Sequence, residues 1–443
     1  MYLSGNSGIE IMKYEKIDKS LFEDNRRRFK EQLIPGSLAI FNSNDIITTS
    51  ADSTMPFVQH RDIFHLSGVD QEESILVIFP DCSTEKNREI LFLKETNEHI
   101  AVWEGEKLTK AAAYETSKIK TVYWLNEFET VFNTLMAEAN NIYLNNNEHT
   151  RANTEAETRE DRFISWCKKK YPNHTYHRSA PIMHKIRSVK HRLELDLMQR
   201  ACDITEQAFR RVLRFLKPGV WEYEIEAEIM HEFLMSRSKG FAYTPIIASG
   251  PNACVLHYIE NNKQCNDGDV ILFDWAAEYA NYASDMSRCL PVNGRFTERQ
   301  KKVYEAVLRV KNEATKLLTP GTMLAEYHKE VGKLMESELL GLNLITSTDI
   351  ENQNPDWPAY KKYFMHGTSH FIGLDTHDVG LWTEPIQENN VFTVEPGIYI
   401  PEENLGIRLE DDVVVQSSGD PFNLMRNIPI EIEEIEELMN AIH

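Results

Sequence analysis

Short apolar runs alternate with amphipathic segments along the first 180 or so residues of the chain. Four runs have the length and the apolar content of strands: residues 37–41 (SLAIF), 74–79 (SILVIF), 89–93 (EILFL) and 142–144 (IYL). Residues 24–33 and 127–137 have helical spacing instead. This mixture of strands and helices predicts an α/β domain.

The pattern changes near residue 185. From there a long helix is predicted, which Pro218-Gly219 ends, and the apolar residues that share one face of it are Leu195, Met198, Ala201, Ile204, Ala208 and Val212. A chain of 443 residues is also longer than a usual single domain. We therefore expect two domains, residues 1–185 and residues 186–443.

The second domain contains two similar stretches, LKPGVWEYEIEAEIMHEFL and LTPGTMLAEYHKEVGKLM. Each is followed by strand-like runs with two acidic residues, Asp274 and Asp285 in the first case and Glu395 and Glu410 in the second. A diverged duplication would place one carboxylate pair on each side of a shared site. The alternative is that Pro-Gly merely marks unrelated turns. Residues 432–442 have the spacing of a short amphipathic helix that packs against the domain.

Acidic residues outnumber basic ones. There are 69 Asp and Glu against 48 Lys and Arg, which gives a formal net charge of −21 at pH 7. This charge disfavours nucleic acids and anionic membranes as partners. The first residues, MYLSGNSGIEIMKYEK, lack the basic and apolar regions of a signal peptide, and no run approaches the roughly twenty apolar residues of a membrane span. With six scattered cysteines as free thiols, a cytoplasmic protein is expected.

Five residues in the second domain are candidates for a metal site: Asp274, Asp285, His370, Glu395 and Glu410. They lie in apolar segments punctuated by glycine, where an uncompensated charge is costly. Four carboxylates gathered in a dry cleft would repel one another and would either take up protons or bind cations. Two divalent ions would match their four negative charges. A set with oxygen ligands, one imidazole and no thiolate favours manganese, iron(II) or cobalt over structural zinc.

Each of these residues, taken singly, has a simpler explanation. An aspartate at a strand end is more often a turn or cap residue than a ligand. Glu395 precedes a Pro-Gly pair, which is itself a turn signal, and Glu410 in the sequence EDD fits a solvated strand edge. Single histidines are more often ordinary core or surface residues than ligands. The metal-site hypothesis therefore depends on the joint pattern.

Several motifs resemble those of the pita-bread metallopeptidases, and most closely those of the aminopeptidase P (Xaa-Pro aminopeptidase) family. Asp274 and Asp285 keep that family's spacing of ten intervening residues, and the chain contains VLHY with His257, HGTSHFIGLDTHDVG, TVEPGIYI and GIRLEDD. The resemblance extends to RRRFKEQLIPGSLAIF, SADSTMPFVQHRDIFHLSG and IAVWEG in the amino-terminal half. It implies an aminopeptidase P N-terminal α/β domain over residues 1–185 and an α+β pita-bread catalytic domain with pseudo-twofold halves over residues 186–443.

The resemblance also implies two divalent metal ions per subunit, with Mn²⁺ preferred and Co²⁺, Fe²⁺ or Zn²⁺ as alternatives. In the family pattern Asp285 and Glu410 bridge both ions, Asp274 binds one ion, and His370 and Glu395 complete the other. The ions would lower the pKa of a bridging water, so that hydroxide can attack a peptide carbonyl. Glu395 would also carry a proton from that water toward the leaving nitrogen.

The same motifs assign further residues around the site. His257 and His377 would donate hydrogen bonds to the carbonyl oxygen and the tetrahedral intermediate. His366 would line the leaving-group side. Tyr399 and Arg408 would support the site, with Arg408 orienting a carboxylate or the tyrosine.

Two residues of the amino-terminal domain are also candidates. Trp103 in VWEG would form a wall of the proline pocket, although a tryptophan in an α/β domain is more often a core residue. Asp52 in SADS resembles a residue that reaches a neighbouring subunit's cleft in this family, whose members are commonly dimers or tetramers. We therefore expect a homodimer or homotetramer that acts on peptides beginning with Xaa-Pro.

The chain departs from the family pattern at three places. Trp275 follows Asp274 where Ala-Gly is usual, and a bulky side chain there could reshape the site. The segment between His377 and Glu395 is short and lacks an arginine often found there, so no contact with a substrate carboxylate is expected from it. The sequence Tyr243-Thr244-Pro245 lies where the family is variable and carries no assignment.

Three classes of function fit the sequence. The first is an Xaa-Pro aminopeptidase. The second is a prolidase, which cuts only Xaa-Pro dipeptides and needs a basic group for the free carboxylate, so the missing arginine weighs against it. The third is a pita-bread binding module without catalysis, which the retained candidate ligands and histidines disfavour. Creatinase-like enzymes share the fold without metals, and methionine aminopeptidases lack this amino-terminal domain.

Overall fold

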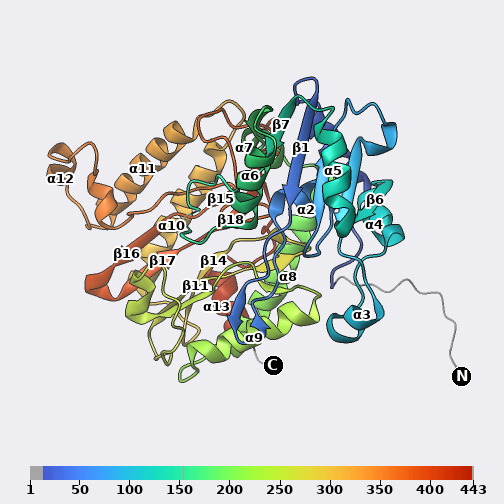
Figure 1. Ribbon diagram of the computed structural model, residues 1–443. Helices are drawn as coiled ribbons and strands as arrows, with labels where there is room; N and C mark the ends of the chain where they lie inside the picture. Colours follow the sequence, from blue (N-terminus) through green and yellow to red (C-terminus); the bar gives the residue numbers. More distant parts are fainter. Residues whose placement is uncertain (1–12, 153, 442–443) are drawn as a thin grey trace, which may run out of the picture. The chain divides into compact units, whose positions relative to one another are not determined.

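The computed structural model describes residues 13–152 and 154–441 (Figure 1). The expectations for residues 1–12, which belong to the segment tested for a signal peptide, and for residue 442 fall outside these ranges. The chain forms two compact units, Met1–Arg187 (unit 1) and Ser188–His443 (unit 2).

Unit 1 alternates helices and strands, as the sequence pattern predicts. Its elements are α1 (Ser20–Lys30), β1 (Ser37–Asn42), β2 (Thr48–Ser50), β3 (Ser53–Thr54), α2 (Arg61–Ser67), β4 (Ile75–Ile78), β5 (Glu89–Leu93), α3 (Glu98–Glu104), α4 (Lys110–Ser117), β6 (Thr121–Trp124), α5 (Phe128–Met136), β7 (Asn141–Leu144), α6 (Arg159–Lys170), β8 (Thr175–Arg178) and α7 (Ala180–Ser188). Six strands form one sheet in the order β6-β5-β4-β1-β7-β8. β4 runs antiparallel to β1 and β5, and the other neighbouring pairs are parallel. The predicted α/β domain is therefore confirmed.

Helices cover both faces of this sheet (Figure 1). Along β1, Ala39 and Phe41 join the core to which α1, α2, α4 and α7 contribute, while Leu38 and Ile40 join the core that α5 and α6 cover. Successive side chains of a strand point to opposite faces, so a strand buried on both sides is apolar throughout. This explains why the strands read as continuous apolar runs in the sequence.

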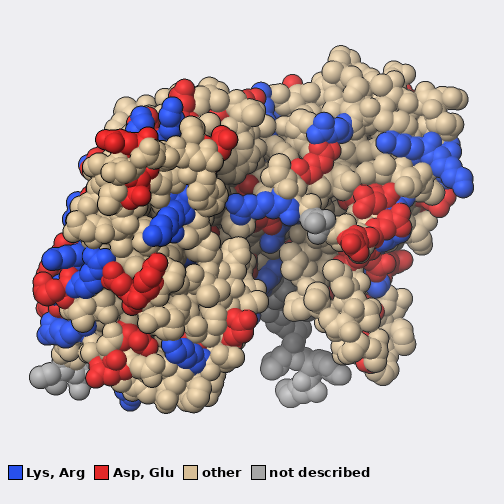
Figure 2. All heavy atoms as spheres, turned by 90° about the vertical axis from the view of Figure 1, so that its left-hand side faces the viewer, with Lys and Arg blue, Asp and Glu red and all other residues tan. Residues whose placement is uncertain are grey.

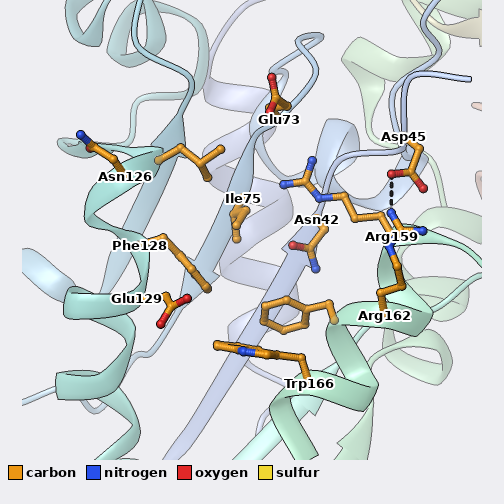
Figure 3. A pocket seen from close by; sticks show the side chains of 12 residues that line it. Asn42, Asp45, Glu73, Ile75, Asn126, Phe128, Glu129, Arg159, Arg162 and Trp166 are labelled. Atoms are coloured by element: carbon orange, nitrogen blue, oxygen red, sulfur yellow. Dashed lines mark hydrogen bonds and ion pairs between the residues drawn. The ribbon is translucent and has the colours of Figure 1, made fainter. Parts of the chain in front are cut away.

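A cavity of about 680 Å³ opens between α5 and α6 in unit 1 (Figure 3). Phe128 and Trp166 line it on the aromatic side. Arg162 lies on the other side, and its Nη2 is 2.6 Å from Asp45 Oδ1. The cavity is thus lined by an arginine that already has a carboxylate partner, and none of the residues predicted for the functional site lines it.

Unit 2 begins with a long helix pair and continues with short strands and a second helix pair. Its elements are α8 (Arg192–Phe215), α9 (Glu222–Met235), β9 (Gly240–Phe241), β10 (Ile246–Ser249), the 3₁₀ helix η3 (Gly250–Cys254), β11 (Val270–Asp274), β12 (Ala277–Tyr279), β13 (Tyr282–Ala283), β14 (Ser287–Pro291), α10 (Glu298–Leu317), α11 (Leu324–Gly341), α12 (Ser347–Glu351), η4 (Ala359–Lys362), β15 (Val391–Val394), β16 (Gly397–Ile400), η5 (Pro401–Glu403), β17 (Leu405–Arg408), β18 (Asp411–Val414), β19 (Phe422–Asn423) and α13 (Ile432–Asn440). α13 buries Ile432 and Ile435 within the unit, as its amphipathic spacing predicts.

The two halves of unit 2 place their acidic residues in the same way. β11 pairs antiparallel with β14, and β15 pairs antiparallel with β18. In each pair one candidate ligand lies at the end of the first strand or directly after it, and the other lies just before the second strand. These ligands are Asp274 and Asp285 in one half and Glu395 and Glu410 in the other. The helix pairs α8–α9 and α10–α11 precede the two strand pairs, so the repeated arrangement matches the pseudo-twofold halves expected of a pita-bread domain.

None of the helices in residues 13–152 and 154–441 combines the length and the apolar character that crossing a bilayer requires. On the face of the molecule shown in Figure 2, acidic and basic side chains are interspersed. That face, as far as it is described, therefore presents no continuous basic surface of the kind that binds a phosphate backbone.

Candidate metal centre

Three of the candidate ligands form a compact group in unit 2. The ligand atoms of Asp285, His370 and Glu410 all lie within 4.8 Å of one another, and the three residues are buried. Glu395 belongs to the same group, because its Oε1 lies 3.6 Å from Nε2 of His370. Asp274 stands in register opposite Ser287, two residues beyond Asp285 along the chain. All five predicted ligands are thus brought together.

Backbone hydrogen bonds fix the segment that carries His370. The Glu395 N–H donates to the carbonyl of Thr368 at 2.8 Å, and the Thr393 N–H donates to the carbonyl of His370 at 3.1 Å. The His370 ring lies with Nδ1 3.0 Å from the Phe371 carbonyl. We assign the proton to Nδ1, since a carbonyl can only accept. Nε2 then keeps its lone pair and faces Asp285 Oδ2 at 3.5 Å, which is the orientation of a metal-ligating histidine.

The pKa shifts of the candidate ligands show that this site lacks positive charge. Burial raises the pKa of Glu410 well above its ordinary value, and the charges of Asp285, Glu395 and Asp274 raise it further. Burial raises the pKa of Glu395 to about 7, although His370 opposes the shift. The pKa of Asp274 is also raised, by burial and by Asp285, against the effect of Arg408. Burial lowers the pKa of His370, but Asp285 and Glu395 outweigh it and leave that pKa raised.

These shifts all point to a deficit of positive charge. Four carboxylates share one buried region with the guanidinium of Arg408 and one imidazole. Oxygen ligands together with an imidazole suit divalent cations, which would compensate the remaining negative charge. The residues present therefore fit a divalent-metal centre.

Arg408 connects one ligand to the surrounding side chains. Its Nη2 donates to Asp274 Oδ2 at 2.6 Å, its Nη1 donates to the Tyr399 hydroxyl at 2.8 Å, and its Nε donates to Ser287 Oγ at 2.8 Å. Ser287 Oγ in turn donates to Glu410 Oε2 at 2.7 Å. The guanidinium is buried, and it holds carboxylates from both halves of unit 2 in place. The sequence-based expectation that it orients a carboxylate or the tyrosine matches both of these contacts.

The hydrogen bonds continue from Arg408 to His366. The Tyr399 hydroxyl accepts from Arg408, so its own proton is free to be donated to His366 Nε2, 2.7 Å away. His366 Nδ1 lies 2.7 Å from the Gly367 carbonyl and must be the protonated nitrogen of a neutral ring. Burial and the nearby charge of Arg408 lower the pKa of His366 to about 3. His366 is therefore a neutral imidazole whose nitrogens are both engaged.

The two remaining predicted histidines lie at the more open side of the site. The ring of His377 is exposed and stands edge-on to that of His370, with ring centroids 4.4 Å apart. His257 follows η3, is exposed, and is near enough that its charge contributes to the lowered pKa of His366, after burial and Arg408.

Trp103 and Asp52, the two candidates from the amino-terminal half, belong to unit 1. Trp103 lies on α3 with 77% of its surface exposed, so the alternative that it is a core residue is wrong. Asp52 lies in the turn between β2 and β3 and is also exposed. Their predicted part in substrate binding stays a prediction.

Three residues that contact the ligands were missed by the sequence reasoning. The Tyr243 hydroxyl donates to Asp274 Oδ1 at 2.6 Å, although its segment carried no assignment. Ser287 bridges Arg408 and Glu410, as described above. Asp412 Oδ2 accepts from the Asp285 N–H at 3.0 Å. The acidic sequence EDD contained a signal for Asp412, whereas nothing near Tyr243 in the sequence points to Asp274.

Trp275 does not reshape the site in the way its size suggested. The side chain next to Asp274 turns away from the ligands and is fully buried. It packs against Phe209 of α8, Phe233 of α9 and Phe273 of β11, with ring centroids 6.5, 6.0 and 6.2 Å away. Neighbouring residues of an extended segment point to opposite faces, which explains how a ligand and a core residue can be adjacent.

Comparison with known proteins identifies the family. Residues 196–417 match metallopeptidase family M24, and residues 22–143 match the aminopeptidase P N-terminal domain. The chain belongs to metallopeptidase family M24. The predicted resemblance to the pita-bread metallopeptidases is thereby confirmed, and membership of a metallopeptidase family supports the expectation that the protein binds a divalent metal.

Two relatives match almost the whole chain. The chain is 33% identical to the Xaa-Pro aminopeptidase of Escherichia coli K12, over 96% of this chain and 99% of that protein. It is 32% identical to the Xaa-Pro aminopeptidase of Haemophilus influenzae, over 98% of this chain and 100% of that protein. The structure of zinc-substituted E. coli aminopeptidase P in complex with product matches with a TM-score of 0.85 at 31% identity, covering 96% of this chain and 99% of that chain.

Proposed function

We propose that the protein is an Xaa-Pro aminopeptidase, which hydrolytically releases the first residue of peptides whose second residue is proline. The observation that carries the proposal is the buried cluster of four carboxylates and one imidazole inside a chain that matches Xaa-Pro aminopeptidases along almost its whole length. A binding module without catalysis would not need this costly cluster.

The proposed ligands are Asp274, Asp285, His370, Glu395 and Glu410, holding two divalent ions with Mn²⁺ preferred. Asp285 and Glu410 are the proposed bridging ligands, which agrees with their position in the compact buried group. Divalent ions bound there supply a lowered pKa for water and a polarised substrate carbonyl. The number and the identity of the ions are part of the proposal.

Glu395 is the proposed proton carrier. Its carboxylate lies between His370 and His366, with Oε1 3.6 Å from His370 Nε2 and Oε2 3.9 Å from His366 Nδ1. Without a bound metal, burial raises the pKa of Glu395 to about 7, and a bound cation would lower it, so the proposed role rests on the position of this carboxylate. Glu395 would accept the proton of the attacking water and deliver it to the leaving nitrogen.

The histidines around the ligands have two proposed roles: stabilising the developing oxyanion and contacting the leaving group. His377 and His257, both exposed near the ligands, would donate hydrogen bonds to the oxygen on which negative charge develops. His366 would line the leaving-group side as a neutral ring, because its Nδ1 proton is used on Gly367 and its Nε2 accepts from Tyr399. His366 is therefore a contact and positioning residue in this proposal, not a proton donor to substrate.

Specificity for proline follows from what the peptide lacks. The nitrogen after the scissile bond is a tertiary amide without an N–H, so the site must offer an apolar surface instead of a hydrogen-bond acceptor. The ring of His366, which packs against the buried ring of Tyr399 with centroids 5.5 Å apart, offers such a surface. We further propose that Trp103 and Asp52 contribute to substrate binding and that the protein assembles as a homodimer or homotetramer. These two proposals rest on the family resemblance.

Prolidase is the alternative activity. Substrates with a blocked amino or carboxyl terminus distinguish it from an aminopeptidase. A prolidase needs a basic partner for the free carboxylate of its dipeptide, and residues 381–390, LWTEPIQENN, contain no basic side chain. An aminopeptidase of this kind should cleave Ala-Pro-Ala under manganese and should lose activity when the amino terminus is acetylated. Amidation of the carboxyl terminus should change kcat/KM only slightly.

A strong dependence on the free carboxyl terminus would identify the enzyme as a prolidase instead. Losing the contact to a free carboxylate costs about 2–5 kcal/mol when a charged partner is left unpaired. A penalty of that size for the amide, with hydrolysis of Ala-Pro alone, would identify a prolidase.

A further inference from the structure

A second cavity of unit 2 adjoins the candidate metal centre. It has a volume of about 770 Å³ and is lined by residues 364–368, by one side of α11 and by residues in the segment 353–361. Cavities of roughly 300–1,000 Å³ bury most of a ligand of drug size, which is also the size of a short peptide. The cavity is thus large enough for several substrate residues.

His366 is common to this cavity and to the metal centre. Its Nδ1 lies 3.9 Å from Glu395 Oε2, while the residue itself lines the cavity. Thr368, another lining residue, accepts the backbone N–H of Glu395 at 2.8 Å. Since His366 is proposed to face the leaving group, the cavity lies on the side of the site where the residues after the scissile bond continue.

The inner wall of the cavity is aromatic and tightly held. Tyr360, Phe364 and His366 follow one another with ring centroids 6.2 and 4.9 Å apart. Tyr360 packs onto α11 at Gly332, where an added Cβ would meet the tyrosine ring at 2.8 Å. The absence of a side chain at Gly332 therefore makes room for the ring, and the wall is formed before any ligand arrives.

The outer part of the cavity carries more basic than acidic groups. Lys329, Lys333 and Lys361 line it, together with Glu336 and Asp356. Only one of these lysines has a carboxylate partner in the part of the chain that the structure describes. It is Lys333, whose Nζ lies 2.6 Å from Glu330 Oε1.

The other two lysines are available to a ligand. Lys361 Nζ lies 4.8 Å from the centroid of the Trp357 ring, which fixes its position without neutralising it. Lys329 is exposed on α11. Counted over the lining residues, three lysines stand beside two carboxylates, whereas the whole chain has a net charge of −21.

We infer that this cavity binds the substrate residues that follow the proline, and that Lys329 and Lys361 select peptides with acidic side chains there. The inference rests on the proposed function, because it takes the direction of the substrate from the role of His366. An aromatic wall would hold the peptide backbone and side-chain stems, while the lysines at the rim would attract a carboxylate.

Three peptides with blocked carboxyl ends isolate the effect of the side chains: Ala-Pro-Glu-Glu-amide, Ala-Pro-Gln-Gln-amide and Ala-Pro-Lys-Lys-amide. We expect kcat/KM for alanine release to be about fivefold higher with Glu than with Gln, and lowest with Lys, since exposed ion pairs are individually weak. The preference should shrink in about 0.5 M salt, where the screening length falls below about 5 Å.

The double variant Lys329→Gln/Lys361→Gln tests which residues are responsible. The ratio of Glu to Gln kcat/KM should fall toward one in this variant. Lys302→Gln is the matched control, because Lys302 is an exposed lysine of α10 that does not line the cavity, and it should keep the wild-type ratio.

Two results would overturn the inference while leaving the proposed function intact. One is alanine release at equal kcat/KM from all three peptides. The other is a Glu preference that the double variant retains or that the Lys302 control loses equally. If no peptide in the series released alanine, the proposed function itself would fail.

Discussion

Lys190 and Asp378 form a buried ion pair behind the segment that carries His370 and His377. The Lys190 Nζ lies 2.9 Å from Asp378 Oδ2, and the two side chains are 2% and 0% exposed. Asp378 Oδ1 also accepts the Val379 N–H at 2.8 Å. The pair therefore holds the backbone next to two residues of the proposed site.

Replacing Lys190 with methionine should destabilise unit 2 strongly. The change would remove the Lys190 cation that lies 2.9 Å from the Asp378 carboxylate, and breaking a buried ion pair costs about 3–5 kcal/mol in comparable cases. For a unit of this size, 1 kcal/mol corresponds to roughly 2–4 °C in Tm, so the expected loss is about 10 °C. Thermal unfolding followed by circular dichroism would measure it.

Activity should fall together with stability, because a shift of the segment moves His370 away from the carboxylates. We expect lower metal content and a lower kcat at temperatures where the variant is still folded. Lys316→Met is the matched control, since Lys316 pairs with Glu313 while both side chains are about half exposed, and it should change Tm by less than about 2 °C.

The double variant Lys190→Met/Asp378→Asn separates an unpaired charge from lost packing. Removing both charges should recover much of the stability that the single change loses, because the negative charge of Asp378 is removed together with the positive charge of Lys190. A Tm for Lys190→Met within about 2 °C of wild type, with full metal content, would refute the reasoning. So would a double variant that is less stable by the sum of the two single changes.

Three further predictions concern the metal centre. Asp285→Asn should remove most of the bound metal and nearly all activity, whereas Asp267→Asn, a change at an exposed aspartate, should alter neither in elemental analysis and peptide assays. His377→Ala should keep its metal but lose about a hundredfold or more in kcat/KM, the effect of removing one donor to a developing oxyanion, and a much smaller loss would show that His377 only packs against His370. Because the pKa of Glu395 is about 7, that of Glu410 is raised further, and protons must leave before a metal binds, manganese affinity should be at least about tenfold weaker at pH 6 than at pH 8 by calorimetry, and a flat profile would contradict this.

The elements and the ligands of unit 2 could be predicted because their signals are local. Short apolar runs ended by an acidic residue mark β11 and β15, and the repeated Pro-Gly pairs mark the turns within two helix pairs. The helices of unit 1 begin and end within a few residues of the segments expected from spacing, as with α1 and α5. Family motifs then supplied the histidines, whose assignment to particular roles no periodicity could give.

The contacts that were missed join residues far apart in the sequence. Tyr243 and Asp274 are separated by β10, η3 and the loop before β11, and Lys190 and Asp378 by most of unit 2. Neither contact can be predicted from composition or periodicity, since each depends on how strands and helices pack. The orientation of Trp275 was missed for a related reason: which face of a segment points to the core is decided by the packed helices α8 and α9.

The charges around each histidine explain why His366 supports the site as a neutral ring, whereas His370 is a candidate ligand. A neutral His366 is compatible with a nearby Arg408, because burial and that guanidinium lower the pKa of His366 to about 3. His370 faces the carboxylates instead, and Asp285 and Glu395 raise its pKa against the effect of burial. Two imidazoles four residues apart are thus held in opposite electrostatic environments. A divalent ion bound at the carboxylates would supply the positive charge that this environment favours, and His370 would face it with Nε2 while Nδ1 donates to the Phe371 carbonyl.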